Sequence, residues 1–556
     1  MATTKKADSQ QQAVVVLRPE NNIKKYESLF LEIDSGRIKL PMCRSELVLD
    51  KDQSSKLIDS ILKGYPIGTF VFWKTREVIR SVKEIGNYPI PITPKGDYAE
   101  YIFDGRQRIA SLYAIWKGIR ITKDGKEIDY RDIFINLDYD AKSDEQIVTI
   151  QKEDGKCYVS VHNLLTQKMS FLLTRAAADK ADLIEDYKHR LTTYDFPTVT
   201  IKDYPIDIAC AVFSRINTGG KLLTLFEIMV AMTYDEKKNF DLALKYSEFV
   251  NGSEDKKDSL AKAKFETIPE STVLQAIAAI SVESVRAKDI LKIRREKFIE
   301  NWSIMESSMF SAVNFIRTKL RVPVSQLLPY SSLLVPFTFF FYKNKNVWPT
   351  PNQAKLLTQF FYWVGLNNRY SGATETKIGE DLTKMLLIIK EKSPKYSNDE
   401  LTMSAEDIAK TWFSAGNSYV KTILCLYASN KPQNFDDDSD VILDNTHLKI
   451  ASSKNYHHVF PRAYLAKHQP TEEPNVIANI TLIDAASNNK IRAKAPSFYL
   501  NEFKQKNKKL GASLRSHLIG TPSAFGILND DYTTFIAKRS QAIADSLNEQ
   551  LNPELE

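Results

Sequence analysis

Residues Asn455–Pro461 read Asn-Tyr-His-His-Val-Phe-Pro, and this short stretch near the end of the 556-residue chain decides the interpretation of the sequence. Adjacent side chains on an extended strand point to opposite sides, so His457 and His458 can take different tasks. One imidazole can hold a divalent metal, while a neutral imidazole beside it can take a proton from water near neutral pH. Such a pair suits metal-assisted hydrolysis. Two adjacent histidines alone would also fit an ordinary loop.

An ordered series of asparagines follows the pair: Asn479 in Ala-Asn-Ile-Thr-Leu, and Asn488 nine residues later. Together these residues resemble the HNH, or ββα-metal, nuclease family over about fifty residues. The resemblance implies that His457 and Asn488 are ligands of Mg²⁺ or Mn²⁺, that His458 is the general base, and that Asn479 supports the loop. The family's usual Asp-His opening is His-His here, which changes ligand softness more than mechanism.

Length and composition indicate the number of domains and the class of protein. A chain of 556 residues with 43% hydrophobic and 26% charged residues predicts two or three globular domains. The four cysteines are scattered without CxxC spacing, which argues against a zinc knuckle or a disulfide framework and fits a reducing cytoplasm. The first dozen residues are polar and unlike a signal peptide. The most apolar stretch, 327–342, is too short to span a bilayer, so no membrane partner is expected.

A basic cluster directly follows the predicted metal site and is the expected binding surface for double-stranded DNA. An ordinary solvated lysine-rich face remains the alternative. The acidic run 436–440 predicts a linker that enters the nuclease domain. The predicted DNA-binding residues are Lys490, Arg492, Lys494, Lys504, Lys506, Lys508 and Lys509.

The N-terminal third contains a second group of polar residues at a strand-to-helix turn. Residues 98–103 alternate as a strand does, Asp104 and Gly105 follow, and apolar residues then recur at helical spacing up to Gly118. A helix start attracts anions, glycine allows a phosphate to approach the backbone, and Arg108 can grip it with two hydrogen bonds. The pattern predicts a phosphate site, although such arginines are often merely solvated.

This region resembles the ParB/sulfiredoxin-like N-terminal domain of GmrSD-type restriction enzymes, with Asp-Gly-Arg-Gln-Arg standing for their Asp-Gly-Gln-Gln-Arg. Further matches are the segment 57–68 and the Phe-Ser-Arg-Ile-Asn-Thr-Gly-Gly loop at 213–220, which precedes a helix with a capping box of Thr224 and Glu227. Arg106 and Cys43 replace family glutamines, which puts base choice or hydrolytic rate in question. The resemblance implies binding of a nucleoside triphosphate (GTP, ATP, UTP or CTP) by Arg44, Asp104, Gly105, Arg106, Gln107, Arg108, Arg215 and Asn217, with Asp104 also catalytic.

The expected architecture is therefore an α+β multidomain chain. It comprises a ParB/sulfiredoxin-like α/β sensor domain at 1–240, a helical connector at 241–440 and a C-terminal HNH nuclease at 441–556. The expected function is an antiphage restriction endonuclease that cuts foreign, modified DNA under nucleotide control, working with a second copy or a defence-system partner subunit. Three alternatives remain: a nuclease whose N-terminal pocket only reads DNA, a modified-DNA-binding regulator or NTPase without coupled cleavage, and a toxin-like nuclease acting on host nucleic acid.

Overall fold

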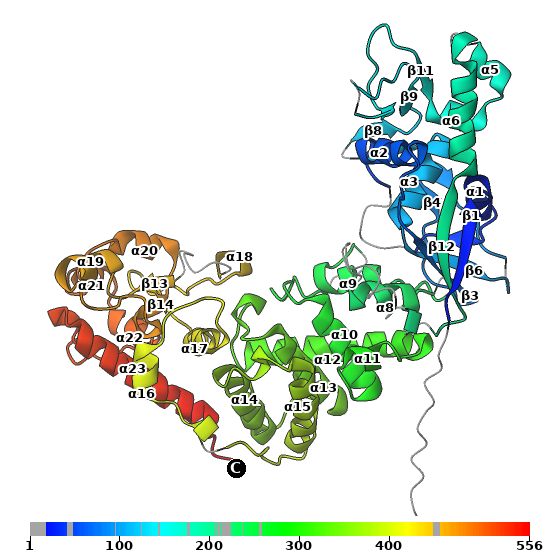
Figure 1. The fold of residues 1–556 in the computed structure, drawn as a ribbon. Helices are drawn as coiled ribbons and strands as arrows, with labels where there is room; N and C mark the ends of the chain where they lie inside the picture. Colours follow the sequence, from blue (N-terminus) through cyan, green and yellow to red (C-terminus); the bar gives the residue numbers. More distant parts are fainter. Residues whose placement is uncertain are drawn as a thin grey trace, which may run out of the picture. The chain divides into compact units, whose positions relative to one another are not determined.

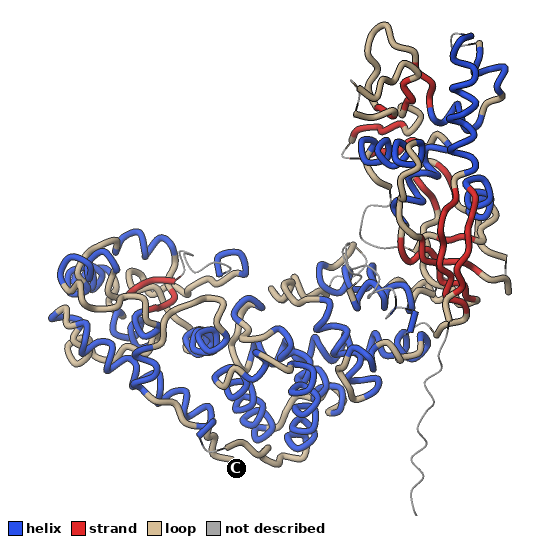
Figure 2. The backbone as a smooth tube through the Cα atoms, in the orientation of Figure 1, coloured by secondary structure: helices blue, strands red, loops and turns tan. Residues whose placement is uncertain are grey.

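The computed structural model divides into two compact units, Met1–Tyr234 and Asp235–Glu556. Strands are concentrated in the first unit, whereas the second is almost entirely helical (Figure 2). Within the described residues, no helix combines the length and apolar character that crossing a bilayer requires. The structure describes residues 18–41, 48–94, 96–123, 125–142, 145–174, 178–205, 208–209, 212, 224–235, 237–254, 258–397, 399–448 and 456–555.

A mixed five-stranded sheet forms the centre of the first unit (Figure 1). Its strands lie in the order β1-β12-β3-β6-β2; β1 pairs antiparallel with β12 and β3 antiparallel with β6, whereas the β12–β3 and β2–β6 pairs are parallel. The bounds are β1 Glu20–Lys25, β2 Ile38–Lys39, β3 Phe70–Thr75, β6 Ala99–Asp104 and β12 Asp195–Lys202.

The strands β3 and β6 of this sheet are buried on both faces, because alternate residues of each enter two different cores. Phe70 and Phe72 of β3 join the larger core, together with apolar residues of α1, α3 and α6. Val71 and Trp73 enter the smaller core on the other face, where Ala231 of α8 also packs. These helices span α1 Tyr26–Asp34, α3 Arg106–Lys117, α6 Ala181–Thr193 and α8 Leu225–Thr233.

The predicted strand, turn and helix around Asp104 are confirmed, as is the capping box that opens α8. Gly118 ends α3 in the left-handed region, with φ of 63°. The other elements of the unit are α2 Lys51–Leu62, α4 Val161–Thr166, α5 Met169–Leu173, β4 Glu84–Ile85, β5 Tyr88–Pro89, β7 Arg120–Lys123, β8 Lys126–Asp129, β9 Phe134–Asn136, β10 Val148–Thr149 and β11 Tyr158–Ser160.

In the second unit, α13 (Leu334–Lys343) lies between α10, α12 and α15, and α14 packs against α17. The large apolar residues of α13 are nearly all buried, so α13 is a core helix. The surrounding helices are α9 Leu242–Asn251, α10 Glu270–Val282, α11 Ala287–Ile290, α12 Arg295–Thr318, α14 Pro351–Leu366, α15 Thr374–Ile389, α16 Ala405–Lys410 and α17 Ser418–Ser429.

The last hundred residues add an antiparallel pair of short strands, β13 (Tyr456–His458) and β14 (Ile480–Leu482), and a group of helices. The C-terminal helix α23 (Tyr532–Leu551) packs against α14 and α16. The C-terminal part is therefore joined to the helices before it within one unit. The remaining helices are α18 Asn445–Leu448, α19 Arg462–His468, α20 Ala485–Ile491, α21 Pro496–Lys506 and α22 Leu510–Arg515.

Candidate functional site

The two adjacent histidines lie on β13, which pairs with β14 so that His457 is opposite Thr481 and His458 opposite Ile480. Two residues separate the end of β14 from the start of α20, which carries Asn488 in its middle. Strand, strand and helix thus follow one another, and the two histidines project from opposite sides of β13.

His457 and Asn488 are brought into direct contact although 31 residues separate them. The distance from His457 Nδ1 to Asn488 Oδ1 is 2.8 Å. Burial lowers the pKa of His457 to about 3, so its imidazole is neutral near pH 7. The other ring nitrogen, Nε2, is buried without a hydrogen-bond partner within the described residues.

This pair fits a divalent cation. Without an ion, His457 Nδ1 donates its hydrogen to Asn488 Oδ1; an octahedral ion with ligands at about 2.1 Å would replace that hydrogen and hold the two atoms about 3 Å apart. A neutral imidazole and an amide oxygen are both acceptable ligands for Mg²⁺ or Mn²⁺. No cluster of three or more His, Cys, Asp or Glu side chains is placed to hold a metal anywhere in the described ranges, so this pair would hold its ion together with water or substrate oxygens.

The ring of His458 contacts a different asparagine from the one that His457 contacts. Its Nε2 atom lies 3.2 Å from Oδ1 of Asn475, a residue that the sequence analysis did not single out. Burial lowers the pKa of His458, and the hydrogen bond with Asn475 opposes that shift. His458 is therefore also neutral near pH 7, as a proton acceptor has to be.

Asn479 is fully buried and bonds backbone groups on both sides of the site. Its Oδ1 accepts from the Phe460 amide at 2.8 Å, and its Nδ2 donates to the carbonyl oxygens of Phe460 and Pro474 at 3.0 and 2.9 Å. These bonds fix the turn that leaves β13 against the segment that enters β14.

The helix that carries Asn488 is anchored by the acidic run. Asp436 is 5% exposed and accepts hydrogen bonds from Ser487 and Lys490 of α20, while Asn434 bonds Asp484 at the start of that helix. The prediction that residues 436–440 form a linker is therefore wrong, because Asp436 bonds α20 and Asp438 bonds Ser513 of α22. No periodicity in the sequence marks such a contact.

The basic cluster is partly neutralised. Lys490 pairs with Asp436, Lys494 with Glu502 at 2.5 Å, and Lys509 with Asp438 at 3.6 Å. In the described part of the chain, the remaining four residues form no ion pair and are exposed: Arg492, Lys504, Lys506 and Lys508. The positive surface available to a phosphate backbone is thus smaller than the sequence suggested.

In the N-terminal unit, Asp104 ends β6 and Gly105 turns the chain into α3 with φ of +81°. A side chain at Gly105 would collide with the ring of Phe70, so both backbone conformation and space require glycine. Arg108, in the first turn of the helix, lies 3.3 Å from the Asp104 carboxylate. The turn therefore brings the two predicted residues together.

The Arg108 guanidinium is largely occupied by the protein itself. It donates to the carbonyl oxygens of Ile67 and Thr69 and lies over the Phe70 ring, 4.7 Å from its centre. Binding a phosphate would require these contacts to be exchanged. Arg106 donates to the carbonyl of Pro41 at 3.0 Å. Arg44, Arg215 and Asn217 lie outside the described residues.

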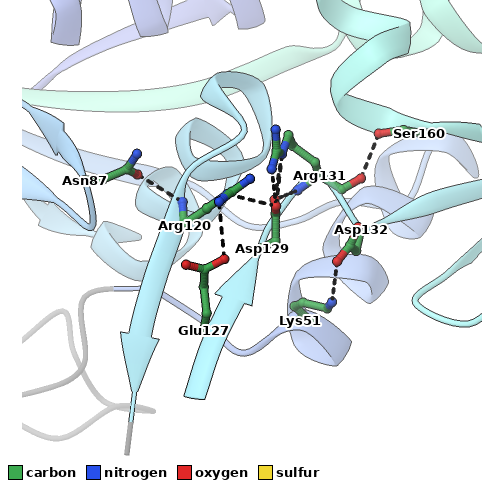
Figure 3. A network of polar contacts seen from close by, with 8 residues as sticks. All are labelled: Lys51, Asn87, Arg120, Glu127, Asp129, Arg131, Asp132 and Ser160. Carbon is green, nitrogen blue, oxygen red and sulfur yellow. Dashed lines mark hydrogen bonds and ion pairs between the residues drawn. The ribbon is translucent and has the colours of Figure 1, made fainter. Parts of the chain in front are cut away.

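A polar network joins the β7–β8 hairpin to the segments around it (Figure 3). The Arg131 Nε atom bonds both Asp129 oxygens, at 2.9 and 3.0 Å, and Arg120 approaches the same carboxylate at 3.2 Å. The hydrogen bonds from Arg131 lower the pKa of Asp129. Ser160 donates to the Arg131 carbonyl at 2.8 Å. These charges satisfy one another, so the network stabilises the fold rather than forming a binding site.

Comparison with known proteins finds a family match for the first unit. Residues 26–234 match the family model described as the GmrSD restriction endonuclease, N-terminal domain. The comparison with curated proteins finds no match. The family match indicates a restriction endonuclease-type defence function, with a nuclease activity and DNA as the substrate. The first unit is therefore similar to the N-terminal domain of the GmrSD restriction endonucleases.

Proposed function

We propose that this protein is a metal-dependent DNA endonuclease whose hydrolytic site is the HNH-type group His457, His458 and Asn488. The observation that carries the proposal is the 2.8 Å approach of His457 Nδ1 to Asn488 Oδ1 on adjacent elements. Two neutral ligand atoms at this separation suit a divalent cation, and a second neutral imidazole lies next in the chain.

His457 and Asn488 would hold Mg²⁺ or Mn²⁺, which supplies positive charge beside the phosphate oxygens. His458 takes a proton from the attacking water, a task for which its neutral state prepares it. Asn479 keeps the turn after His458 in place through its bonds to Phe460. The DNA backbone would be bound by four exposed basic residues: Arg492, Lys504, Lys506 and Lys508.

The N-terminal unit would act as sensor and switch for modified foreign DNA. In this proposal a nucleoside triphosphate, whether GTP, ATP, UTP or CTP, binds at the turn of Asp104 and Gly105 and is hydrolysed there. Its γ-phosphate is a strong local charge whose loss can release a loop. Calorimetry of the wild type and Arg108→Ala with each nucleotide tests this step, and absence of binding to the wild type at millimolar concentration contradicts it.

The test of the main proposal is digestion of a panel of DNAs that carry different base and backbone modifications. Each DNA is incubated with the full chain, with and without each nucleotide, and with Mg²⁺, Mn²⁺ or excess chelator. Cleavage that requires the metal and disappears in His458→Ala supports the proposal. Binding without cleavage under every condition contradicts it.

A second candidate, a modified-DNA reader without nucleotide-coupled cleavage, is favoured by the state of Arg108. Because its guanidinium already bonds two carbonyl oxygens and Asp104, it supports the turn at Ile67–Thr69 and offers little to a triphosphate. The nucleotide calorimetry separates this candidate from the regulated nuclease.

A further inference from the structure

The side chain of Asn475 lies between His458 and the backbone of Phe413. Its Oδ1 atom is 3.2 Å from His458 Nε2, and its Nδ2 atom donates to the Phe413 carbonyl at 3.2 Å. The backbone carbonyl of Asn475 in turn accepts from the Phe413 amide at 2.8 Å. One residue thus joins the histidine to a segment more than forty positions earlier.

The contact between these two segments continues through the two residues after Asn475. Trp412 forms an antiparallel bridge with Val476, and the Ile477 amide donates to the Thr411 carbonyl at 2.9 Å. The bond between the Phe413 amide and the Asn475 carbonyl belongs to this same bridge. The Asn475 amide group is therefore held from its backbone and from its side chain at once.

The Phe413 carbonyl decides which way the Asn475 amide faces. A carbonyl oxygen only accepts, so the NH₂ end of the side chain must point to Phe413 and the oxygen end to His458. That oxygen also only accepts, so His458 Nε2 must carry the hydrogen. The lone pair of the ring is then on Nδ1, for which no partner exists in the described part of the chain.

We propose that Asn475 is a positioning residue for the general base: it holds the His458 ring and its Nε2–H tautomer, and so presents Nδ1 as the proton acceptor. This inference rests on the proposed nuclease function. It also makes the segment Thr411–Phe413 part of the support of the site, because Phe413 fixes the amide that fixes the histidine.

The test begins with a readout that does not depend on cleavage. The full chain, labelled with ¹⁵N at its seven histidines, gives the protonation of each ring nitrogen in long-range ¹H–¹⁵N spectra. The His458 signals are assigned by their loss in His458→Ala. We expect a single Nε2–H form in the wild type and a mixture of both tautomers in Asn475→Ala.

Asn548 provides a matched control. Its side chain likewise accepts one hydrogen bond and donates one, from the Met403 amide at 2.7 Å and to the Met403 carbonyl at 3.1 Å, but within the described residues it bonds no histidine. Asn548→Ala should lower thermal stability about as much as Asn475→Ala does. It should leave the His458 tautomer and the cleavage rate unchanged.

Kinetics on a cleavable DNA supply the second readout. For Asn475→Ala we expect kcat to fall at least about tenfold, part of the 10²–10⁴ that a general base contributes. KM and the metal concentration for half-maximal rate should stay within about twofold, since His457 and Asn488 are untouched. Asn475→Asp keeps an acceptor toward Nε2 and should recover part of the rate.

The outcomes are distinguishable. A wild-type His458 in the Nδ1–H form overturns the role of Asn475, and so does an Asn475→Ala variant with kcat within threefold of the wild type. An equal loss of rate in Asn548→Ala also overturns it, because the effect would then be one of stability. A wild type that cuts no DNA with either metal overturns the proposed function itself, and with it any catalytic meaning of the Asn475 bond.

Discussion

The buried side chain of Asn479 offers the sharpest test of how the site is supported. Asn479→Ala removes three hydrogen bonds at once and leaves the Phe460 amide, the Phe460 carbonyl and the Pro474 carbonyl without these partners. Phe460 is fully buried, so water cannot easily replace the lost bonds there. The substitution should therefore destabilise the second unit.

The expected loss in the free energy of unfolding follows from the polar groups that Asn479→Ala leaves unpaired. Each buried polar group without a partner costs about 1–3 kcal/mol, and the half-buried Pro474 carbonyl counts least because water can reach it. We expect a loss of about 3 kcal/mol in the free energy of unfolding, a large share of the roughly 5–15 kcal/mol typical of a folded protein. Asn479→Asp should cost at least as much, because a carboxylate oxygen would then face two carbonyl oxygens.

Urea unfolding followed by tryptophan fluorescence measures this loss. The two compact units can unfold separately, so the transition of the second unit has to be fitted by itself. Asn489→Ala is the control, since this neighbouring asparagine is exposed on α20 and should change stability by no more than about 0.5 kcal/mol. A loss below about 1 kcal/mol for Asn479→Ala, or an Asn479→Asp variant as stable as the wild type, would refute the reasoning.

Three further predictions concern the histidines and the metal. His458→Ala should lower the cleavage rate by about 10² or more while DNA affinity, measured by fluorescence anisotropy, stays nearly unchanged; activity within about threefold of the wild type would remove His458 from the mechanism. His457→Ala and Asn488→Ala should each raise the Mg²⁺ or Mn²⁺ concentration needed for half-maximal cleavage, and an unchanged metal titration in Asn488→Ala would place the ligand elsewhere, with Asn489 next to be tested. Burial lowers the pKa of His517 to about 3, and its ring bonds Thr481 and the Gln433 carbonyl, so the unfolded chain binds a proton below about pH 6.5 that the folded chain does not. Stability present at pH 7 should therefore fall by about 2 kcal/mol by pH 5 through this group, and His517→Gln should reduce the slope of the stability–pH profile by about one proton; an unchanged slope would contradict the buried neutral state.

Local secondary structure could be predicted well from the sequence. The alternation of residues 98–103, the glycine at 105 and the helical spacing up to Gly118 all predict elements that the structure contains. The capping box at Thr224 is equally local. Such signals are readable because the residues that produce them lie within a few positions of one another.

Helix boundaries in the middle of the chain were harder to predict. Apolar residues recur at helical spacing from Ile290 to Met305, yet α11 ends at Ile290 and α12 begins at Arg295. The apolar residues on both sides of the break are buried, so periodicity continued across a turn. Burial of Ile293 in that turn is a tertiary effect, which spacing alone does not distinguish from a helix.

Long-range polar contacts were beyond the sequence altogether. Arg539 is fully buried, donates to the Ala478 and His517 carbonyls at 2.8 and 3.3 Å, and lies 5.0 Å from the Tyr427 ring centre. Within the described residues no carboxylate pairs with it, and a lone arginine in a mixed helical pattern is normally expected on the surface. Only the folded chain brings these carbonyl groups to it.

The same distinction explains how the candidate nuclease site is built. The side chains proposed for direct chemical tasks form a readable series, because the chain order of strand and helix is also the order of His457, His458 and Asn488. The groups that hold them come from segments with no spacing rule: Phe413 acts through Asn475, and Asp436 through α20. Both segments precede residue 441, where the nuclease domain was predicted to begin. The geometry of the site therefore depends on the chain from about residue 411 onward, and a change in that earlier segment can reach the general base without altering any residue of the motif.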